Sequence, residues 1–214
     1  MSSLNSGSPA RRKESSYSRR RSASDAIGAI LTSASGQDRA GSDRALILRA
    51  AVLGRLDSRL LYAMRTRFHG RAAETVAKAL GRIGEYGAIW LVIGIVLAFA
   101  DPDKGEDWVV AGILGPVAIG LNFAVKVIVR RPRPVLEGLP PLGGAPSSLS
   151  FPSAHATSSF ACATAMTRIA PEAAVLFILA AALAAGRPYL GMHYPSDVLG
   201  GAVIGTVLGL VVPL

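Results

Sequence analysis

Three short stretches in the C-terminal half of the chain hold residue types that could transfer a phosphoryl group. They are KVIVRRPRP (126–134), PSAH (152–155) and GRPYLGMHYPSD (186–197). Three cations among them, Lys126, Arg133 and Arg187, could neutralise the charge on the equatorial oxygens of a phosphoryl group in its transition state. Backbone N–H groups behind Ser153 could form a further anion site if a helix begins there.

The same stretches contain two of the 3 histidines of the chain. A neutral histidine can attack phosphorus. His193 is followed four residues later by Asp197, and an acid at that spacing on a helix can fix the tautomer of the ring. The leaving alkoxide needs a proton, which His155 could supply. These residues indicate a phosphoryl-transfer site with a nucleophile and an acid.

Apolar runs on either side of these stretches predict helices that cross a membrane. The runs cover residues 86–100, 108–125, 173–186 and 198–214, and a more polar segment, 153–169, lies between the second and third. Some are shorter than the ~20 residues that a spanning helix needs, but each can extend into flanking residues. We therefore expect an all-α, polytopic membrane bundle with about five transmembrane helices.

Successive helices of such a bundle alternate in direction, so the end of the second, the start of the third, the end of the fourth and the start of the fifth share one face of the membrane. This face receives the candidate site residues: Lys126, Arg133, Ser153, Ala154, His155, Arg187, His193 and Asp197. Cations that snorkel at helix ends would account for Arg130 and Arg131. Snorkelling does not explain two histidines and an aspartate on the same face.

Charge and hydrophobicity separate along the chain. The 214 residues are 50% hydrophobic and only 17% charged, against about 25% charged in an average soluble protein. Residues 1–82 hold 16 Lys/Arg and 6 Asp/Glu, a net of +10, whereas residues 83–214 hold 7 and 8, a net of −1. We interpret 1–43 as a disordered basic tail, 44–82 as amphipathic helices on the membrane surface, and 83–214 as the membrane domain. The basic arm suits anionic lipid headgroups, and no motif indicates nucleic acid.

The three stretches resemble the motifs of the type 2 phosphatidic acid phosphatase superfamily, in the same order and with the same internal spacing. Residues 126–134 resemble its Lys-x6-Arg-Pro motif, 152–155 its Pro-Ser-Gly-His motif, and 186–197 its Ser-Arg-x5-His-x3-Asp motif. Each motif is weak alone, but three in order on a polytopic chain are a strong signal. The resemblance covers about 83–214 and includes, within the superfamily, a similarity of the segment around 147–161 to bacterial decaprenylphosphoryl-phosphoribose phosphatases.

The resemblance implies a membrane lipid phosphatase that needs no metal or other cofactor. It implies that His193 is the nucleophile that becomes a phosphohistidine, that Asp197 orients it, and that His155 is the general acid. The implied phosphate ligands are Lys126, Arg133, Ser153, Ala154 and Arg187. Two positions depart from the pattern: Ala154 replaces Gly, which matters if the motif needs a positive φ, and Gly186 replaces Ser.

The sequence alone does not identify the substrate, and it leaves two other kinds of function open. A polyprenyl-phosphoryl pentose phosphate is our expectation, with polyprenyl pyrophosphate, phosphatidate and phosphatidylglycerophosphate as alternatives. A transferase acting on another alcohol, or a non-catalytic protein that binds anionic lipid, would use the same cations. Because short Lys/Arg-rich segments stay cytoplasmic, five spans would place the site on the cytoplasmic face of a bacterial cytoplasmic membrane.

Overall fold

The structure is a computed structural model that describes residues 52–67, 69–144 and 149–214, and in these residues it contains helices and no strand. An unlabelled first helix covers residues 52–66. The labelled helices are α2 (Arg71–Ile83), α3 (Ala88–Ala100), α4 (Gly105–Val129), α5 (Ala154–Ile169), α6 (Leu176–Tyr189) and α7 (Pro195–Val211). Residues Gly54–Leu214 form one compact unit. The predicted tail, 1–43, and residues 44–51 lie outside the described residues.

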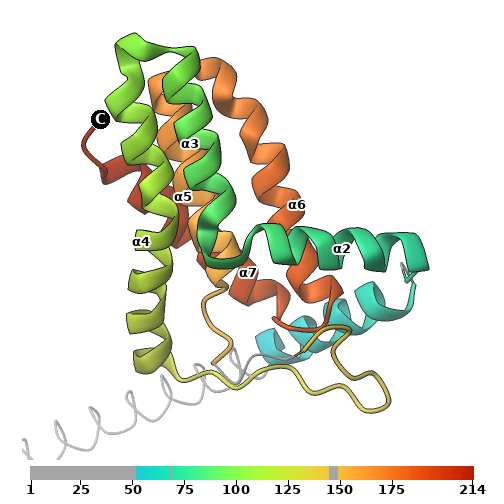
Figure 1. Ribbon diagram of the computed structural model, residues 1–214. Coiled ribbons are helices and arrows are strands. Elements are labelled where there is room, and N and C mark those ends of the chain that lie inside the picture. The colour runs from blue at the N-terminus through green and yellow to red at the C-terminus, as the bar shows by residue number, and fades with distance from the viewer. Residues whose placement is uncertain (1–51, 68, 145–148) are drawn as a thin grey trace, which may run out of the picture. The chain divides into compact units, whose positions relative to one another are not determined.

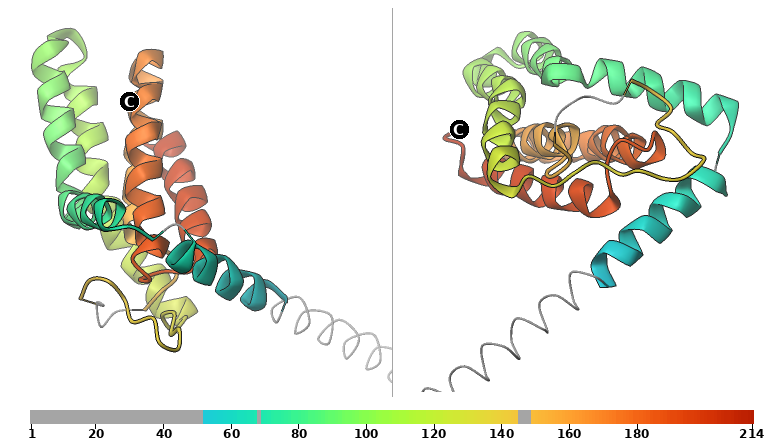
Figure 2. Two further views of the ribbon diagram at one scale, coloured as in Figure 1. Left: turned by 90° about the vertical axis from the view of Figure 1, so that its right-hand side faces the viewer. Right: turned by 90° about the horizontal axis from the view of Figure 1, so that it is seen from below.

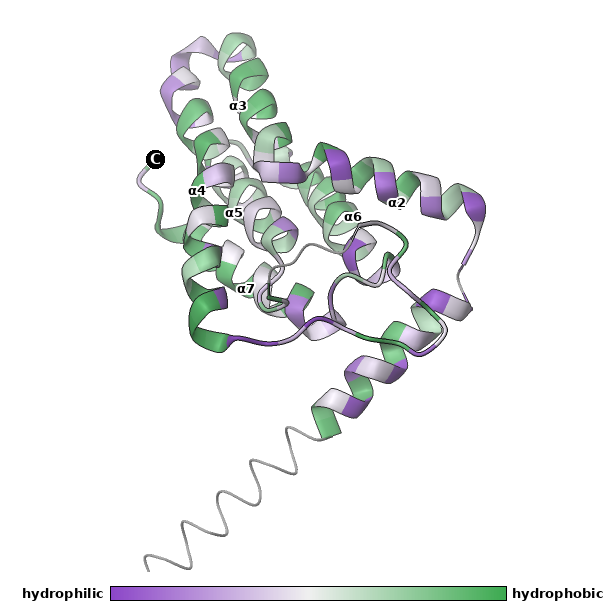
Figure 3. Cartoon of the chain, turned by 60° about the horizontal axis from the view of Figure 1, so that its bottom comes forward, coloured by the Kyte–Doolittle hydropathy of each residue, from purple (hydrophilic) through white to green (hydrophobic). Residues whose placement is uncertain are grey.

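The first helix and α2 occupy the region predicted to hold surface helices. On the first helix, Asp57, Leu61 and Arg65 are buried against the protein, while Leu56 and Leu60 are about half exposed. The side of the first helix that carries Leu56 and Leu60 therefore points away from the other helices. Figure 3 shows mixed polar and apolar colouring on both helices and continuous apolar colouring on α3. This arrangement is compatible with helices that lie on a membrane surface.

Helices α3 and α4 form an antiparallel pair that glycines bring into close contact. A Cβ added to Gly94 would lie 2.9 Å from Cα of Gly112, so the backbones touch where these glycines face each other. A short 3-10 helix, Glu85–Gly87, joins α2 to α3. The two helices are bent by 50° at this junction.

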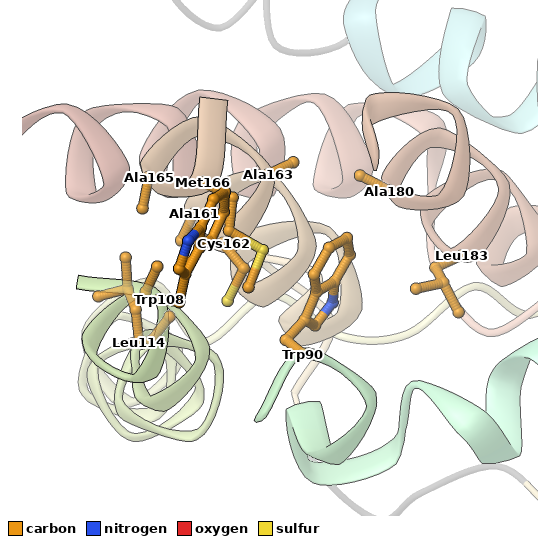
Figure 4. Close-up of a cluster of buried hydrophobic side chains, with 12 residues drawn as sticks. Trp90, Trp108, Leu114, Ala161, Cys162, Ala163, Ala165, Met166, Ala180 and Leu183 are labelled. Carbon is orange, nitrogen blue, oxygen red and sulfur yellow. The ribbon is translucent and has the colours of Figure 1, made fainter. Parts of the chain in front are cut away.

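Helix α5 lies at the centre of the bundle and packs on α4, α6 and α7. Figure 4 shows Trp90, Trp108 and Leu183 from three different helices around Cys162 and Met166 of α5. Cys162 is fully buried. Inside a membrane, close contact of this kind stabilises helix association more than removal from water does.

Two features explain how polar α5 is accommodated. Its hydroxyls bond to neighbouring helices: Nδ2 of Asn122 donates to Thr157 over 2.9 Å, and Nε1 of Trp90 donates to Ser159 over 3.1 Å. Against α7, a Cβ on Gly201 would lie 2.7 Å from the carbonyl oxygen of Ser153. Gly201, Gly205 and Gly209, four residues apart on α7, thus let this helix pack closely on α5.

Two helices of the described residues, Pro102–Val129 and Pro171–Tyr189 with their leading 3-10 turns, are long and apolar enough to cross a membrane, and the bent pair α2–α3 would make a third. Helix α7 is a shorter apolar helix. Helix α5 has 16 residues, about 24 Å at 1.5 Å per residue. The helical fold is as predicted, whereas the count of five spans remains a prediction.

The helix directions bring four helix ends together. The end of α4, the start of α5, the end of α6 and the start of α7 all lie at the lower end of the bundle in Figure 1. The segment that follows α4 crosses this end (Figure 2). It is held there by a bond from the backbone N–H of Leu142 to the carbonyl oxygen of Leu190, over 2.9 Å.

Candidate active site

A cavity of about 230 Å³ opens where the four helix ends meet. We call it the phosphate pocket. Six of the eight residues predicted from the sequence line it: Lys126, Arg133, Ala154, His155, Arg187 and His193. The other two lie directly behind its wall, because Ser153 precedes Ala154 and Asp197 lies behind His193. The structure thus brings together residues spread over more than seventy positions of sequence.

The three cations reach the pocket from different segments. Nζ of Lys126, in the last turn of α4, donates to the carbonyl oxygen of Leu149 over 2.5 Å. Nη1 of Arg133 donates to the carbonyl oxygen of Met192 over 2.5 Å, and burial lowers the pKa of Arg133. Arg187, in the last turn of α6, is 7% exposed. These cations can share the charge of one phosphate.

Four buried polar atoms at the pocket lack a hydrogen-bond partner among the described residues. They are Oδ1 of Asn122, the hydroxyl oxygen of Ser153, Nε of Arg187 and Nδ1 of His193. Ser153 is the N-cap of α5, yet its side chain makes no cap bond. A buried donor without a partner is costly unless a ligand completes it. The start of α5 therefore offers an anion site to an incoming phosphate.

Ala154 occupies the position where the family motif has glycine. It is the first residue of α5, and only Tyr86 and Arg130 among the described non-glycine residues have positive φ. Since helical backbone suits alanine, this departure imposes no strain here. At Gly186, a Cβ would find its nearest neighbour at 3.8 Å, so the missing serine reflects no lack of space.

His155 faces both the pocket and helix α2. Its Nε2 lies 2.9 Å from the carbonyl oxygen of Gly81. Because a carbonyl oxygen only accepts, Nε2 must carry a hydrogen. Nδ1 is then the nitrogen that can exchange a proton with a ligand. The family resemblance did not predict this contact, because α2 lies outside the three motifs.

His193 lies between an arginine and an aspartate. Its Nε2 is 3.4 Å from Nη1 of Arg133, and its Nδ1 is 3.7 Å from Oδ2 of Asp197. Since guanidinium only donates, this long contact favours a lone pair on Nε2 and the proton on Nδ1, toward the carboxylate. Burial, opposed by Asp197, lowers the pKa of His193 to about 4. The ring is therefore neutral near pH 7, as a nucleophile must be.

Asp197 is fully buried and held by several donors. The hydroxyl of Ser150 donates to Oδ2 over 2.5 Å, and the backbone N–H of Tyr194 donates to the same oxygen over 2.8 Å. Nη1 of Arg131 donates to Oδ1 over 2.7 Å. The carboxylate can thus keep its position while His193 gains and loses a phosphoryl group.

The prediction that Arg130 and Arg131 both snorkel at the end of α4 is wrong for Arg131. Arg130 fits it, since this residue is exposed and ends the helix in a left-handed conformation. Arg131 instead turns inward. Its Nη1 reaches Ser196 and Asp197, and its Nη2 lies 2.7 Å from Oδ2 of Asp57 on the first helix.

Asp57, on the buried face of the first helix with Leu61 and Arg65, is 5% exposed. It accepts the backbone N–H of Ser196 over 3.0 Å and the hydroxyl of the same residue. Asp57, Arg131 and Asp197 thus form a chain of alternating charges, which we call the Asp57 clasp. An acid among the leucines of the first helix was the one sequence signal for this contact. Ser150 and Ser196 carried none.

No group of three or more His, Cys, Asp or Glu side chains that could hold a metal ion occurs in residues 52–67, 69–144 and 149–214. The side chains around the pocket are mainly cations and imidazoles. This set of groups suits an anion better than it suits a cation.

Known proteins share both the sequence pattern and the fold. Residues 108–214 match the PAP2 superfamily. A decaprenylphosphoryl-5-phosphoribose phosphatase of Mycobacterium tuberculosis is 39% identical over 136 residues, which cover 64% of this chain and 76% of the relative. The protein of the same name from Mycolicibacterium smegmatis is 38% identical over 145 residues, 66% of this chain and 79% of the relative.

A solved structure, a PAP2-type phosphatidylglycerolphosphate phosphatase from Bacillus subtilis, superposes with a TM-score of 0.59 at 24% identity. The match covers 77% of this chain and 88% of that protein. At this identity the likeness concerns the fold, which is that of a transmembrane protein.

Proposed function

This chain belongs to the PAP2 superfamily and is a phosphatase, and from that premise we propose that it removes the terminal phosphate of a polyprenyl-phosphoryl pentose phosphate in the membrane. The observation that carries the proposal is the phosphate pocket, where two histidines and three cations converge. A protein that only binds anionic lipid would need the cations but not a buried histidine held between Arg133 and Asp197.

In the first step, the phosphate binds to Lys126, Arg133 and Arg187 and to the start of α5. Nε2 of His193 attacks phosphorus, and the bond from phosphorus to the ester oxygen breaks. His155, as imidazolium, gives its proton to the leaving oxygen. The products of this step are the lipid alcohol and a phosphohistidine.

In the second step, water attacks the phosphohistidine. His155, now neutral, takes a proton from this water, and the bond from phosphorus to Nε2 breaks. Inorganic phosphate leaves, and both histidines return to their starting forms. Asp197 holds the Nδ1 proton of His193 throughout, so that Nε2 remains the reacting nitrogen. The cycle uses groups of this chain and requires no metal ion.

The choice of substrate rests on the two mycobacterial relatives, whose names state a decaprenylphosphoryl-5-phosphoribose phosphate ester as substrate. Two relatives of one name, at 38% and 39% identity, favour the same class of lipid here. The alternatives from the sequence, polyprenyl pyrophosphate and glycerolipid phosphates, remain comparison substrates.

We further propose that 83–214 is the membrane domain, that 44–82 lies on the membrane surface, and that the basic tail contacts anionic headgroups. The proposal rests on the charge asymmetry between residues 1–82 and 83–214. With five spans, the pocket faces the cytoplasm.

Purified protein in detergent, assayed for phosphate release on a panel of lipid phosphates, tests the function. We expect the highest kcat/KM with the polyprenyl-phosphoryl pentose phosphate and full activity with a chelator present. Binding without phosphate release from any lipid would contradict the assignment as an enzyme. Loss of activity with chelator and recovery with Mg²⁺ would contradict the metal-free mechanism. Transfer of phosphate to added alcohols in preference to water would indicate a transferase.

A further inference from the structure

A second cavity adjoins the phosphate pocket and takes no part in the steps above. Its volume is about 400 Å³, and we call it the outer cavity. Helix α2 and the turn after it supply Lys78, Gly81, Arg82 and Glu85, and the opposite wall includes Leu142 and Met192. Apart from Met192, at a variable position of the third motif, these residues lie outside the family motifs.

The two cavities share part of their walls. Glu85, His155 and Arg187 line both. A ligand whose phosphomonoester lies in the phosphate pocket therefore continues past His155 into the outer cavity. Two glycines let α2 approach this wall closely. A Cβ on Gly81 would lie 3.0 Å from Nη1 of Arg187, and a Cβ on Gly84 would lie 2.9 Å from Cδ2 of His155.

The chemistry of the outer cavity favours an anion. Lys78 and Arg82 are one helical turn apart, so they share a face of α2. Lys78 is paired with Glu74 over 2.5 Å. For the Arg82 side chain, the described part of the chain offers no hydrogen bond or ion pair. Arg82 is therefore available to a ligand, and Lys78 can exchange its partner Glu74 for one.

We propose that the outer cavity binds a second phosphate of the substrate, a phosphodiester separated from the phosphomonoester by a polyhydroxylated linker. Lys78 and Arg82 bind the diester, and Glu85, between the two cavities, accepts hydrogen bonds from hydroxyls of the linker. The inference rests on the proposed function and names the feature of the substrate that α2 recognises. A lipid with a single phosphate ester would place no anion beside Lys78 and Arg82.

A matched pair of substrates tests the proposal. Both are lipid-linked pentose 5-phosphates: in one a phosphodiester joins the pentose to the lipid, and in the other a neutral ether does. We expect wild-type protein to show a lower KM for the diester. The double variant Lys78→Gln/Arg82→Gln should raise that KM roughly tenfold, the loss expected for charge-assisted hydrogen bonds. It should leave kcat, and both constants for the ether, within about twofold of wild type.

The control is Arg67→Gln/Arg71→Gln, which removes two charges near the start of α2 but outside the outer cavity. It should leave the preference for the diester intact. Glu85→Gln should weaken binding of both pentose substrates but not of a phosphomonoester whose linker has no hydroxyls. Equal KM values for diester and ether in wild-type protein, or an equal effect of the double variant on both, would overturn the outer-cavity assignment and leave the phosphatase intact. Turnover of neither substrate would overturn the proposed function as well.

Discussion

Nη1 of Arg131 lies 2.7 Å from Oδ1 of Asp197, so an arginine at a variable position of the first motif holds the carboxylate that faces His193. The other nitrogen of the same guanidinium bonds to Asp57 on the first helix. The orientation of the proposed nucleophile therefore depends on a residue more than 130 positions away in the sequence.

Arg131→Gln should lower kcat by roughly a hundredfold, because Asp197 loses its charged partner and a shift of about 1 Å in a reacting group can cost that much. KM should change little, since Arg131 does not line the phosphate pocket. Arg130→Gln, at the exposed neighbouring position, is the matched control and should keep wild-type kcat. A change in the KM of Arg131→Gln with kcat unaltered would contradict the role given to Arg131. An equal loss of kcat in Arg131→Gln and Arg130→Gln would also contradict it.

Asp57→Asn should lower kcat by a smaller factor, roughly tenfold, because Arg131 keeps its bonds to Ser196 and Asp197. The losses of kcat in Asp57→Asn and Arg131→Gln should not add. In a protein that already carries Arg131→Gln, Asp57→Asn should lower kcat little further, because Asp57 has lost its partner. Steady-state kinetics of the two single variants and the double variant measure this coupling. Independent, additive losses would show that Asp57 acts separately from the clasp.

The activity of the protein should persist at acid pH. Burial, opposed by Asp197, lowers the pKa of His193 from 6.5 to about 4. Because the lowered pKa favours the neutral ring, the nucleophile stays unprotonated until the pH falls to about 4. The acid limb of kcat/KM, corrected for the substrate phosphate that ionises near pH 6, should then have its midpoint near 4. A midpoint near 6.5 would contradict a buried, neutral His193.

Single cysteines at opposite ends of α4 should report the sidedness of the pocket. In a Cys162→Ala background, Val135→Cys, at a residue 89% exposed after α4, should react with an impermeant reagent added from the cytoplasmic side. Asp103→Cys, before α4, should react only from the other side. The reverse pattern would place the pocket outside and would contradict the charge-based topology.

The sequence alone predicted the helical fold and which helix ends would meet, because apolar runs and alternating helix direction are properties of the chain itself. It could not predict the Asp57 clasp. Arg131 lies beside Arg130, and only the turn of the chain after α4 sends one inward and the other to the surface. The bend between α2 and α3, which creates the outer cavity, depends equally on tertiary packing.

At Ala154, the motif comparison suggested a strained backbone that the structure does not have. Its departure from glycine raised the question of a positive φ, and the structure places it in regular helix at the start of α5. The contact of His155 with Gly81 likewise involves a backbone oxygen, which leaves no mark in the sequence.

The central claim is that Nε2 of His193 becomes covalently phosphorylated. The most direct test is to quench the protein during turnover with alkaline denaturant, which preserves phosphohistidine, and to locate the phosphoryl group by peptide mass spectrometry. We predict a phosphoryl group on His193 in wild-type protein, and none in a folded His193→Ala variant that has also lost turnover. Turnover by His193→Ala at the wild-type rate, or a phosphoryl group found on another residue, would contradict the account.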